Sequence, residues 1–360
     1  MITEKIRVLV VDDSVTVRRL VTDALSSEPD IEIIGSAANG RIALQKLTQS
    51  PPDVVTLDIE MPELDGIATL IEIRKTHPKL PVVMFSSVTE RAASATLEAL
   101  ARGATDYVTK PSVQGGVAQA LQTIREELGG RIRALGRRTG TSAAPQGHHR
   151  LPSPSRGKPQ LLAIGASTGG PNAVSEVLQS LRKLPIPIVL TQHMPPLFTR
   201  LFAERLDANG PHRAKEAEDG DVLEPGLVLV APGDHHMTFA REGARVVVRL
   251  NQAPAENSCR PAVDPMLRSA VDVYGAGVLS VILTGMGQDG LRGCERVRAT
   301  GGQVVVQDEA TSVVWGMPGF VAKANLAHAV VPLSGIALQI TSRLNDARAT
   351  AERSGGHVVR

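Results

Sequence analysis

The feature that most constrains the fold is an alternation of short apolar runs with amphipathic segments along the first third of the chain. The apolar runs are rich in Val, Ile and Leu, which is typical of strands buried on both faces. The segments between them carry apolar residues at helical spacing. Strict alternation of this kind predicts a doubly wound, parallel α/β sheet. The expected strands are residues 6–11, 31–37, 53–57, 82–85 and 106–109, and the expected helices are 15–26, 41–49, 70–77, 93–102 and 117–128.

Polar and charged residues stand where these strands end: Asp12, Asp13, Asp58, Ser86 and Lys110. The carboxyl ends of parallel strands form the ligand site of such a sheet, so we expect these side chains to gather there. Three carboxylates at one edge repel each other unless a cation lies between them, and a set of few oxygen ligands suits Mg²⁺. A carboxylate beside Mg²⁺ and a lysine is suited to accept a phosphoryl group. The alternative is that these residues are only solvated helix caps and loop acids. That interpretation is favoured for any single aspartate, but not for all five residues at the strand ends of one sheet.

On these residues, the segment from 6 to about 125 resembles a response-regulator receiver domain, which is a flavodoxin-like fold. Met61-Pro62 and Asp65-Gly66 after the third strand, and Tyr107 before Lys110-Pro111, strengthen the resemblance. The resemblance implies a receiver over residues 1–125. It implies that Asp58 is phosphorylated, that Lys110 contacts the phosphoryl group, that Ser86 and Tyr107 form the switch pair, and that Asp12, Asp13, Asp58 and the Glu60 carbonyl hold Mg²⁺.

Residues 126–159 differ in composition from both flanking segments. From residue 129 onward Gly, Pro, Ser, Thr and Arg dominate and no acidic residue occurs. Such a segment has little apolar surface to bury, so we expect a flexible basic linker; a nucleic-acid contact is the alternative interpretation.

The second part of the chain, residues 160–345, also predicts a mostly parallel α/β sheet, with a β-hairpin added. Residues 346–360 are expected to be a C-terminal tail. The expected strands are 161–165, 186–190, 227–230, 277–283 and 304–306, the expected helices are 172–181 and 291–299, and the expected hairpin pairs 237–240 with 245–250 around Glu242-Gly243.

The stretch 161–171 contains a Gly-x-Ser-x-Gly pattern centred on Ser167. In this pattern a sharp turn between strand and helix exposes a nucleophilic hydroxyl, and the flanking glycines permit the bend. Pro171 suits the first turn of the helix that follows. The alternative is a glycine-rich turn in which Ser167 only caps that helix.

His193 and Asp289 also follow predicted strands, so Ser167, an imidazole and a carboxylate are expected at one edge. The imidazole would take the serine proton, and the carboxylate would orient the imidazole. The backbone around Met286 offers N–H groups for an oxyanion. His193 as an ordinary structural histidine and Asp289 as a helix cap are the alternatives.

Three other features are given minor roles. We expect no catalytic role for His235-His236, because adjacent strand residues point to opposite faces. Arg260 could hold a substrate carboxylate or merely precede a helix, and we favour the substrate-side role. Cys259 and Cys294, the only cysteines, are expected to be reduced and inert.

Residues 160–345 resemble the catalytic domain of the chemotaxis protein-glutamate methylesterase (CheB) family. The matching segments are 165–170, 191–195, 231–234, Arg260-Pro261, 284–290 and 315–318. The resemblance implies that Ser167 is the nucleophile, His193 the base and Asp289 the orienting acid, with Thr168 and the Met286 backbone supporting the oxyanion. It implies no cofactor for the esterase.

The resemblance further implies a phosphorylation-activated serine esterase that removes methyl groups from glutamates of methyl-accepting chemotaxis receptors. Deamidation of particular receptor glutamines by the same triad is implied as well. A histidine kinase of the chemotaxis system would be the phosphodonor. The unphosphorylated receiver would block the Ser167 edge.

Composition excludes several other classes of protein. The net charge of +2 and an aromatic content of 2% do not favour a nucleic-acid-binding surface. No apolar run approaches a membrane span, and no signal segment is apparent, so we expect a cytoplasmic protein that is not embedded in a membrane. A binding output domain in place of an enzyme, and a hydrolase with another substrate, are the rival hypotheses.

Overall fold

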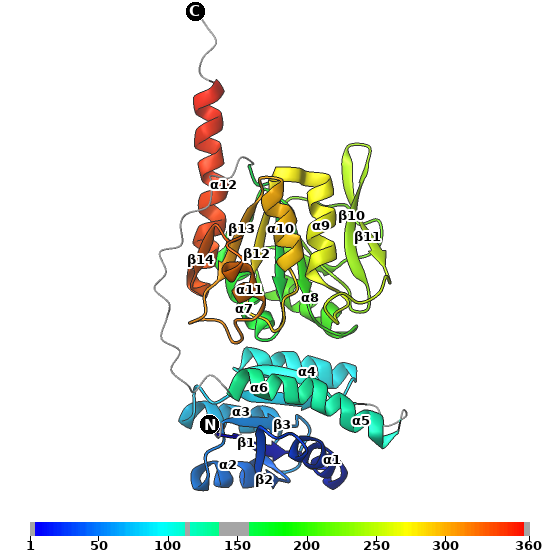
Figure 1. The fold of residues 1–360 in the computed structure, drawn as a ribbon, viewed down its shortest axis with the longest axis vertical. Coiled ribbons are helices and arrows are strands. Elements are labelled where there is room, and N and C mark those ends of the chain that lie inside the picture. Colours follow the sequence, from blue (N-terminus) through cyan, green and yellow to red (C-terminus); the bar gives the residue numbers. More distant parts are fainter. Residues whose placement is uncertain (1–3, 112–115, 137–157, 356–360) are drawn as a thin grey trace, which may run out of the picture. The chain divides into compact units, whose positions relative to one another are not determined.

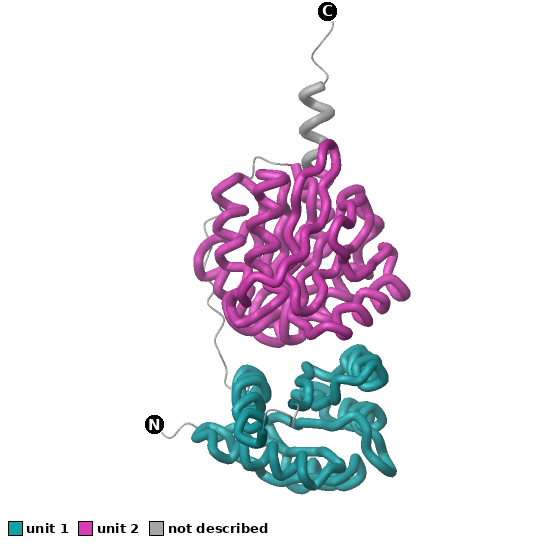
Figure 2. Tube along the Cα trace, turned by 90° about the vertical axis from the view of Figure 1, so that its right-hand side faces the viewer, with its two compact units in different colours: residues 1–145 teal, residues 146–360 magenta. Residues whose placement is uncertain are grey.

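The computed structural model describes residues 4–111, 116–136 and 158–355, and the chain divides into two compact units, residues 1–145 and 146–360 (Figure 2). Each unit has its own parallel sheet. Residues 137–157 of the predicted linker and residues 356–360 of the predicted tail lie outside the described residues. Among the described helices, none combines the length and the apolar character that a membrane span requires.

The sheet of the first unit has the strand order β2-β1-β3-β4-β5, with all neighbours parallel. This is the flavodoxin-like order, so the predicted receiver fold is confirmed. The order reverses between β1 and β3, which opens a crevice at their carboxyl ends. The strands are β1 (Ile6–Val11), β2 (Ile31–Ala37), β3 (Val54–Leu57), β4 (Val82–Ser86) and β5 (Asp106–Thr109).

The helices of this unit begin at side-chain caps, which explains where they start. Ser14, Asn39, Asp65 and Thr89 each accept a hydrogen bond from the main-chain N–H three residues ahead. The helices that follow are α1 (Val15–Ser26), α2 (Gly40–Gln49), α3 (Gly66–Thr76) and α4 (Glu90–Ala101).

The last helical segment of the unit extends further than the sequence predicted. After α5 (Val117–Thr123) comes a π-helical turn, η2 (Ile124–Leu128), and then α6 (Gly129–Gly136), where we expected the linker to have begun. Ile132 and Leu135 continue the buried stripe of the preceding turns. Arg131 and Arg133 pair with Asp106 and Asp30, so the basic composition of this stretch is balanced by acids on other elements.

The second unit has a seven-stranded sheet with the order β14-β13-β12-β6-β7-β9-β8, and again all neighbours are parallel. Every residue of the central strand β6 is buried, so both faces of the sheet are covered. The strands are β6 (Leu161–Ala166), β7 (Ile188–Gln192), β8 (Arg213–Glu216), β9 (Leu227–Val230), β12 (Val278–Ile282), β13 (Gln303–Gln307) and β14 (Ala329–Val331).

Two groups of helices pack against this sheet (Figure 1). One group joins α7 with α8 and α12, and the other joins α9 with α10. The helices are α7 (Gly170–Ser180), α8 (Phe198–Asn209), α9 (Val263–Tyr274), α10 (Leu291–Ala299), α11 (Met317–Lys323) and α12 (Leu333–Gly355). The last of these runs into the residues that we expected to form a tail.

The predicted β-hairpin is confirmed. Strand β10 (His236–Glu242) pairs antiparallel with β11 (Arg245–Asn251), and Gly243 takes a positive φ in the turn between them. Met237, Phe239 and Val248 join the buried core of the unit, where β10 packs against α9. The hairpin therefore extends the core beyond the parallel sheet and leads into the loop that precedes α9.

Candidate active site and phosphoryl-acceptor site

The crevice of the first unit gathers the predicted charged residues. Asp12 and Asp58 are buried at 2% and 4% exposure, and the Lys110 Nζ lies 2.8 Å from a carboxylate oxygen of each. Burial raises the pKa of Asp58 to about 6; Asp12 adds to this shift, and the hydrogen bond from Lys110 opposes it. This carboxylate is thus held next to a cation in a crowded anionic site.

Carboxylate oxygens of Asp12, Asp13 and Asp58 lie within 4.8 Å of one another. Such an all-oxygen set is suited to a hard divalent cation, so these residues could hold a metal ion. Asp13 and Asp58 line a cavity of about 260 Å³, which is also lined by Glu60, Ser86 and Lys110.

The predicted switch residues, Ser86 and Tyr107, come from neighbouring strands of the same sheet. Both are buried, and burial raises the pKa of the Tyr107 phenol, which stays protonated. Among the described residues, the Ser86 Oγ makes long contacts, to the carbonyls of Ser87 and Ala92, at 3.3 and 3.4 Å. A phosphoryl group on Asp58 would compete for this hydroxyl at little cost.

In the second unit, Ser167 directly follows β6 in the expected turn. Gly169 has a φ of +73°, and a Cβ there would lie 2.5 Å from Val313, so only glycine fits. Helix α7 begins after Gly169 without any side-chain cap and has Pro171 in its first turn. Ser167 therefore does not cap the helix, which removes the alternative interpretation of this motif.

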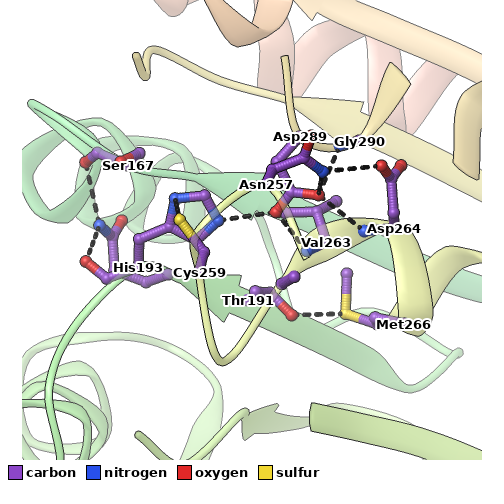
Figure 3. Close-up of polar contacts among 12 residues, drawn as sticks. Ser167, Thr191, His193, Asn257, Cys259, Val263, Asp264, Met266, Asp289 and Gly290 are labelled. Carbon is purple, nitrogen blue, oxygen red and sulfur yellow. Dashed lines mark hydrogen bonds and ion pairs between the residues drawn. The ribbon is translucent and has the colours of Figure 1, made fainter. Parts of the chain in front are cut away.

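His193 lies beside Ser167 because their strands are neighbours. Ala166 is in register with Gln192, and Ser167 and His193 are the residues that directly follow them on the two paired strands. The His193 N–H donates to the Ala166 carbonyl at 3.1 Å. The close-up in Figure 3 shows Ser167 and His193 on adjoining segments. The Ser167 hydroxyl makes no hydrogen bond to another described residue, so the structure shows adjacency of the two residues and not a formed Ser167–His193 bond.

The imidazole of His193 is bonded to Asp289, as predicted. Its Nε2 lies 2.7 Å from an Asp289 carboxylate oxygen (Figure 3). Burial alone would lower the pKa of His193, but the Asp289 hydrogen bond, together with Cys259, raises it above its ordinary value. Because Asp289 takes Nε2, Nδ1 is the other nitrogen that can receive a proton, and among the described residues its neighbour is the Cys259 Sγ.

Asp289 is held by many donors although it is only 1% exposed. The main-chain N–H groups of Val263, Asp264 and Gly290 bond its two oxygens at 2.6, 3.0 and 2.9 Å. Burial raises its pKa, but the bond from His193 and these N–H groups outweigh burial and keep the carboxylate ionised. Two of these three N–H groups, those of Val263 and Asp264, belong to the first turn of α9. Helix α10, which follows Asp289 in the sequence, has no side-chain cap. It is therefore not simply a cap for α10.

Candidate oxyanion donors lie around Ser167. Ser167 N–H donates to the Thr284 carbonyl, and Thr284 Oγ1 donates to the Thr168 carbonyl at 2.9 Å. These bonds tie the turn after β6 to the loop after β12, which carries Met286. Among the described residues, the main-chain N–H groups of Thr168 and Met286 donate to no acceptor, so both stay available for a ligand.

The structure adds contacts for three residues that were given minor roles. The guanidinium of Arg260 bonds Asp234 and the carbonyls of Gln252 and Ala253, so it braces a loop, and its substrate-side role stays a prediction. Cys259 is a free thiol, as expected for a reduced cysteine, and its Sγ lies 3.4 Å from His193 Nδ1 (Figure 3). His236 is buried, and its Nδ1 accepts a hydrogen bond from the Ala262 N–H.

Asn257 and Asp264 were missed by the sequence analysis. Asn257 Nδ2 lies 3.1 Å from Asp264 Oδ2 and 3.1 Å from Asp289 Oδ1, so one amide bridges two buried acids. Both residues belong to the segment around Arg260-Pro261 that had been singled out. No sequence pattern in that segment indicated a contact with Asp289, which lies more than twenty positions further along the chain.

Comparison with known proteins agrees with this geometry. Residues 162–340 match the CheB methylesterase family model, and residues 8–122 match the response regulator receiver domain. A protein-glutamate methylesterase/protein-glutamine glutaminase of Nocardioides sp. is 51% identical over 349 residues, covering 94% of this chain and 95% of the relative. This chain belongs to the CheB methylesterase family.

A relative of the same printed name from Trichodesmium erythraeum is 47% identical and covers 94% of the chain and 99% of its own length. The CheB methylesterase catalytic domain of Thermotoga maritima, a solved structure, is 41% identical, covers 50% of this chain and 96% of its own length, and superposes with a TM-score of 0.49. Each of these two full-length alignments covers 94% of this chain and therefore spans both the receiver match and the methylesterase match.

Proposed function

We propose that this chain is a phosphorylation-activated serine esterase that hydrolyses glutamate methyl esters of methyl-accepting chemotaxis receptors. We also propose that it deamidates particular receptor glutamines to glutamate. Membership of the CheB family and the names of its full-length relatives support both activities. The observation that carries the proposal is the 2.7 Å bond between His193 and Asp289, made at the edge where Ser167 follows the neighbouring strand.

In the proposed reaction, the Ser167 hydroxyl gives its proton to His193 Nδ1 as its oxygen attacks the ester carbonyl. Asp289 stabilises the imidazolium that forms, and the N–H groups of Thr168 and Met286 stabilise the oxyanion. His193 then protonates the departing methoxide, so methanol leaves and an acyl-serine remains. Water, deprotonated by the same imidazole, frees the glutamate. An amide would follow the same path with ammonia as the leaving group.

Regulation is assigned to the receiver. A histidine kinase of the chemotaxis system would donate a phosphoryl group to Asp58. Asp12, Asp13, Asp58 and the Glu60 carbonyl would hold Mg²⁺, and Lys110 would contact the phosphoryl oxygens. The metal, when bound, offsets charge on the transferring group. Ser86 and Tyr107 would then report phosphorylation and shift the population towards an active state. We also propose that the protein acts in the cytoplasm, because its proposed substrates are glutamates on the cytoplasmic helices of the receptors.

Replacement of the nucleophile tests the enzymatic proposal. The full-length Ser167→Ala variant, supplied with acetyl phosphate and Mg²⁺, should release no methanol from membranes that carry methylated receptors. Asp58 should still take up phosphate, as measured by the intact mass of the protein, because the two sites are in separate units. Retained methanol release would contradict the assignment of Ser167. An active parent protein that releases no methanol but hydrolyses other esters would indicate another substrate.

A further inference from the structure

Gln192, the last residue of β7, is buried beside the nucleophile turn and has no part in the mechanism above. It is 2% exposed, and its Nε2 donates to the main-chain carbonyl of Ser167 at 2.9 Å. The Gly170 N–H donates to the same oxygen at 2.7 Å. Two donors at one carbonyl occupy both of its lone pairs, so the Ser167–Thr168 peptide group is fixed in orientation.

This fixed peptide group also carries a candidate oxyanion donor. In a planar trans peptide the N–H points opposite to the C=O, so holding the Ser167 carbonyl sets the direction of the Thr168 N–H. Thr168 is 4% exposed, and its N–H has no acceptor among the described residues. A buried donor left unpaired costs about 1–3 kcal/mol, which is reasonable where a developing oxyanion will use it.

The chain makes room for the glutamine amide. A Cβ at position 170 would lie 2.0 Å from Gln192 Oε1, although Gly170, unlike Gly169, has no positive φ that requires glycine. Within the described part of the chain, Oε1 accepts no hydrogen bond. The polar interactions of the buried amide are thus made through its donor end, which acts mainly on the Ser167 carbonyl.

We propose that Gln192 is a positioning residue for the oxyanion site, aiming the Thr168 N–H through the Ser167–Thr168 peptide. The inference rests on the proposed function, because it takes Ser167 as the nucleophile. Gln192 does not touch the substrate, so its loss should weaken stabilisation of the transition state and leave substrate binding unchanged. This separates it from a residue that only supports the fold.

The test uses the full-length Gln192→Met variant, which keeps the side-chain length and removes the donor. With acetyl phosphate and Mg²⁺, kcat for methanol release should fall about tenfold while KM stays within twofold, a smaller loss than the about 100- to 1,000-fold seen when an oxyanion donor is deleted. Labelling of Ser167 by a fluorophosphonate, whose P=O oxygen needs the same donors, should slow by a similar factor. A kcat and labelling rate within twofold of the parent, or a loss confined to KM, would overturn the proposal.

Two further variants complete the experiment. Gln192→Glu keeps the shape of the amide but sets a carboxylate against the carbonyl; it should lose more activity, and it decides the question if the methionine variant does not fold. Thr238→Val removes a comparable side-chain bond, 2.8 Å to the Arg249 carbonyl in the hairpin, and should leave both rates unchanged. If the parent releases no methanol, the proposed function fails and this inference with it. If the parent is active and the Gln192 variants match it, only the role of Gln192 fails.

Discussion

At the scale of single residues, the candidate site depends on one buried carboxylate that serves two purposes. Asp289 takes the His193 Nε2 on one side and main-chain N–H groups at the start of α9 on the other. The bond from His193 and these N–H groups together hold the pKa of Asp289 below its ordinary value, and the positive end of a helix favours negative charge. The carboxylate in turn favours the protonated form of the imidazole. Asp289 and His193 therefore shift each other's pKa values, the carboxylate downward and the imidazole upward.

Removing the charge of Asp289 should change both the rate and its pH dependence. In Asp289→Asn, kcat should fall about 1,000- to 10,000-fold, because the amide no longer selects the productive tautomer. Catalysis needs neutral His193, so activity rises with pH through the pKa of that residue. The carboxylate raises this pKa, and its loss should move the rising limb of the remaining activity to lower pH.

A pH profile of kcat/KM for methanol release measures this shift. Asp272→Asn, at an exposed aspartate that pairs with Arg296, is the matched control and should keep the parent profile. A rising limb that stays in place or moves to higher pH in Asp289→Asn would contradict the assignment of His193 as the base oriented by Asp289.

At the scale of elements, the site depends on how closely the loops after β6 and β12 approach each other. A Cβ at Gly285 would lie 2.4 Å from Met317 Sδ and 2.8 Å from the Ser167 Cβ. Gly285 N–H also donates to the Val314 carbonyl at 3.0 Å, so the backbone there has little freedom to retreat. Glycine at this position therefore lets the loop approach Ser167, the proposed nucleophile, this closely.

Gly285→Ala should displace Ser167 and reduce methanol release by at least about tenfold, since misplacing reacting groups by about 1 Å can cost 100-fold. Overpacking should also lower the free energy of unfolding by about 1–3 kcal/mol. Denaturant unfolding and methanol release measure the two effects. Gly335→Ala in α12, where the nearest atom to a new Cβ is 3.5 Å away, should show neither. Equal activity in both variants would show that the loop tolerates the shift.

The elements themselves differ in how well the sequence predicts them. Central strands such as β1, β6 and β12 are mostly apolar, so they were predicted. The edge strands β8 and β14 were missed, because β8 is Arg-Ala-Lys-Glu and β14 has only three residues. Helix α6 was missed because its arginines have partners, Asp106 and Asp30, that are distant in sequence.

The candidate site follows the same division. Residues directly after central strands, such as Ser167, His193 and Asp58, could be predicted, because parallel strands bring their carboxyl ends to one edge. Asn257, Cys259 and Asp264 could not, because they lie on a long loop and at the start of α9. Their contacts with His193 and Asp289 depend on the path of the chain between β11 and α9, which no local pattern specifies.

At the scale of the whole molecule, the two units have separate sheets and cores, so each is expected to fold without the other. The proposed regulation therefore predicts how the rate of methanol release changes when the receiver is removed or phosphorylated. If the unphosphorylated receiver restrains the catalytic unit, its removal should raise the basal rate. Phosphorylation should raise the rate only while the receiver is present. Both effects reflect one equilibrium between restrained and active populations.

Deletion of residues 1–140 tests this predicted increase in the basal rate. Methanol release by the fragment should exceed that of the unphosphorylated full chain by about tenfold or more, which corresponds to about 1.4 kcal/mol of restraint. Acetyl phosphate with Mg²⁺ should activate the full chain but not the fragment, and it should not activate a full-length Asp58→Asn control. Far-UV circular dichroism would check that the fragment is folded. If the folded fragment releases methanol more slowly than the unphosphorylated full chain, the receiver assists the catalytic unit. Removal of an inhibitory domain cannot lower the rate, so this result would contradict the proposed restraint.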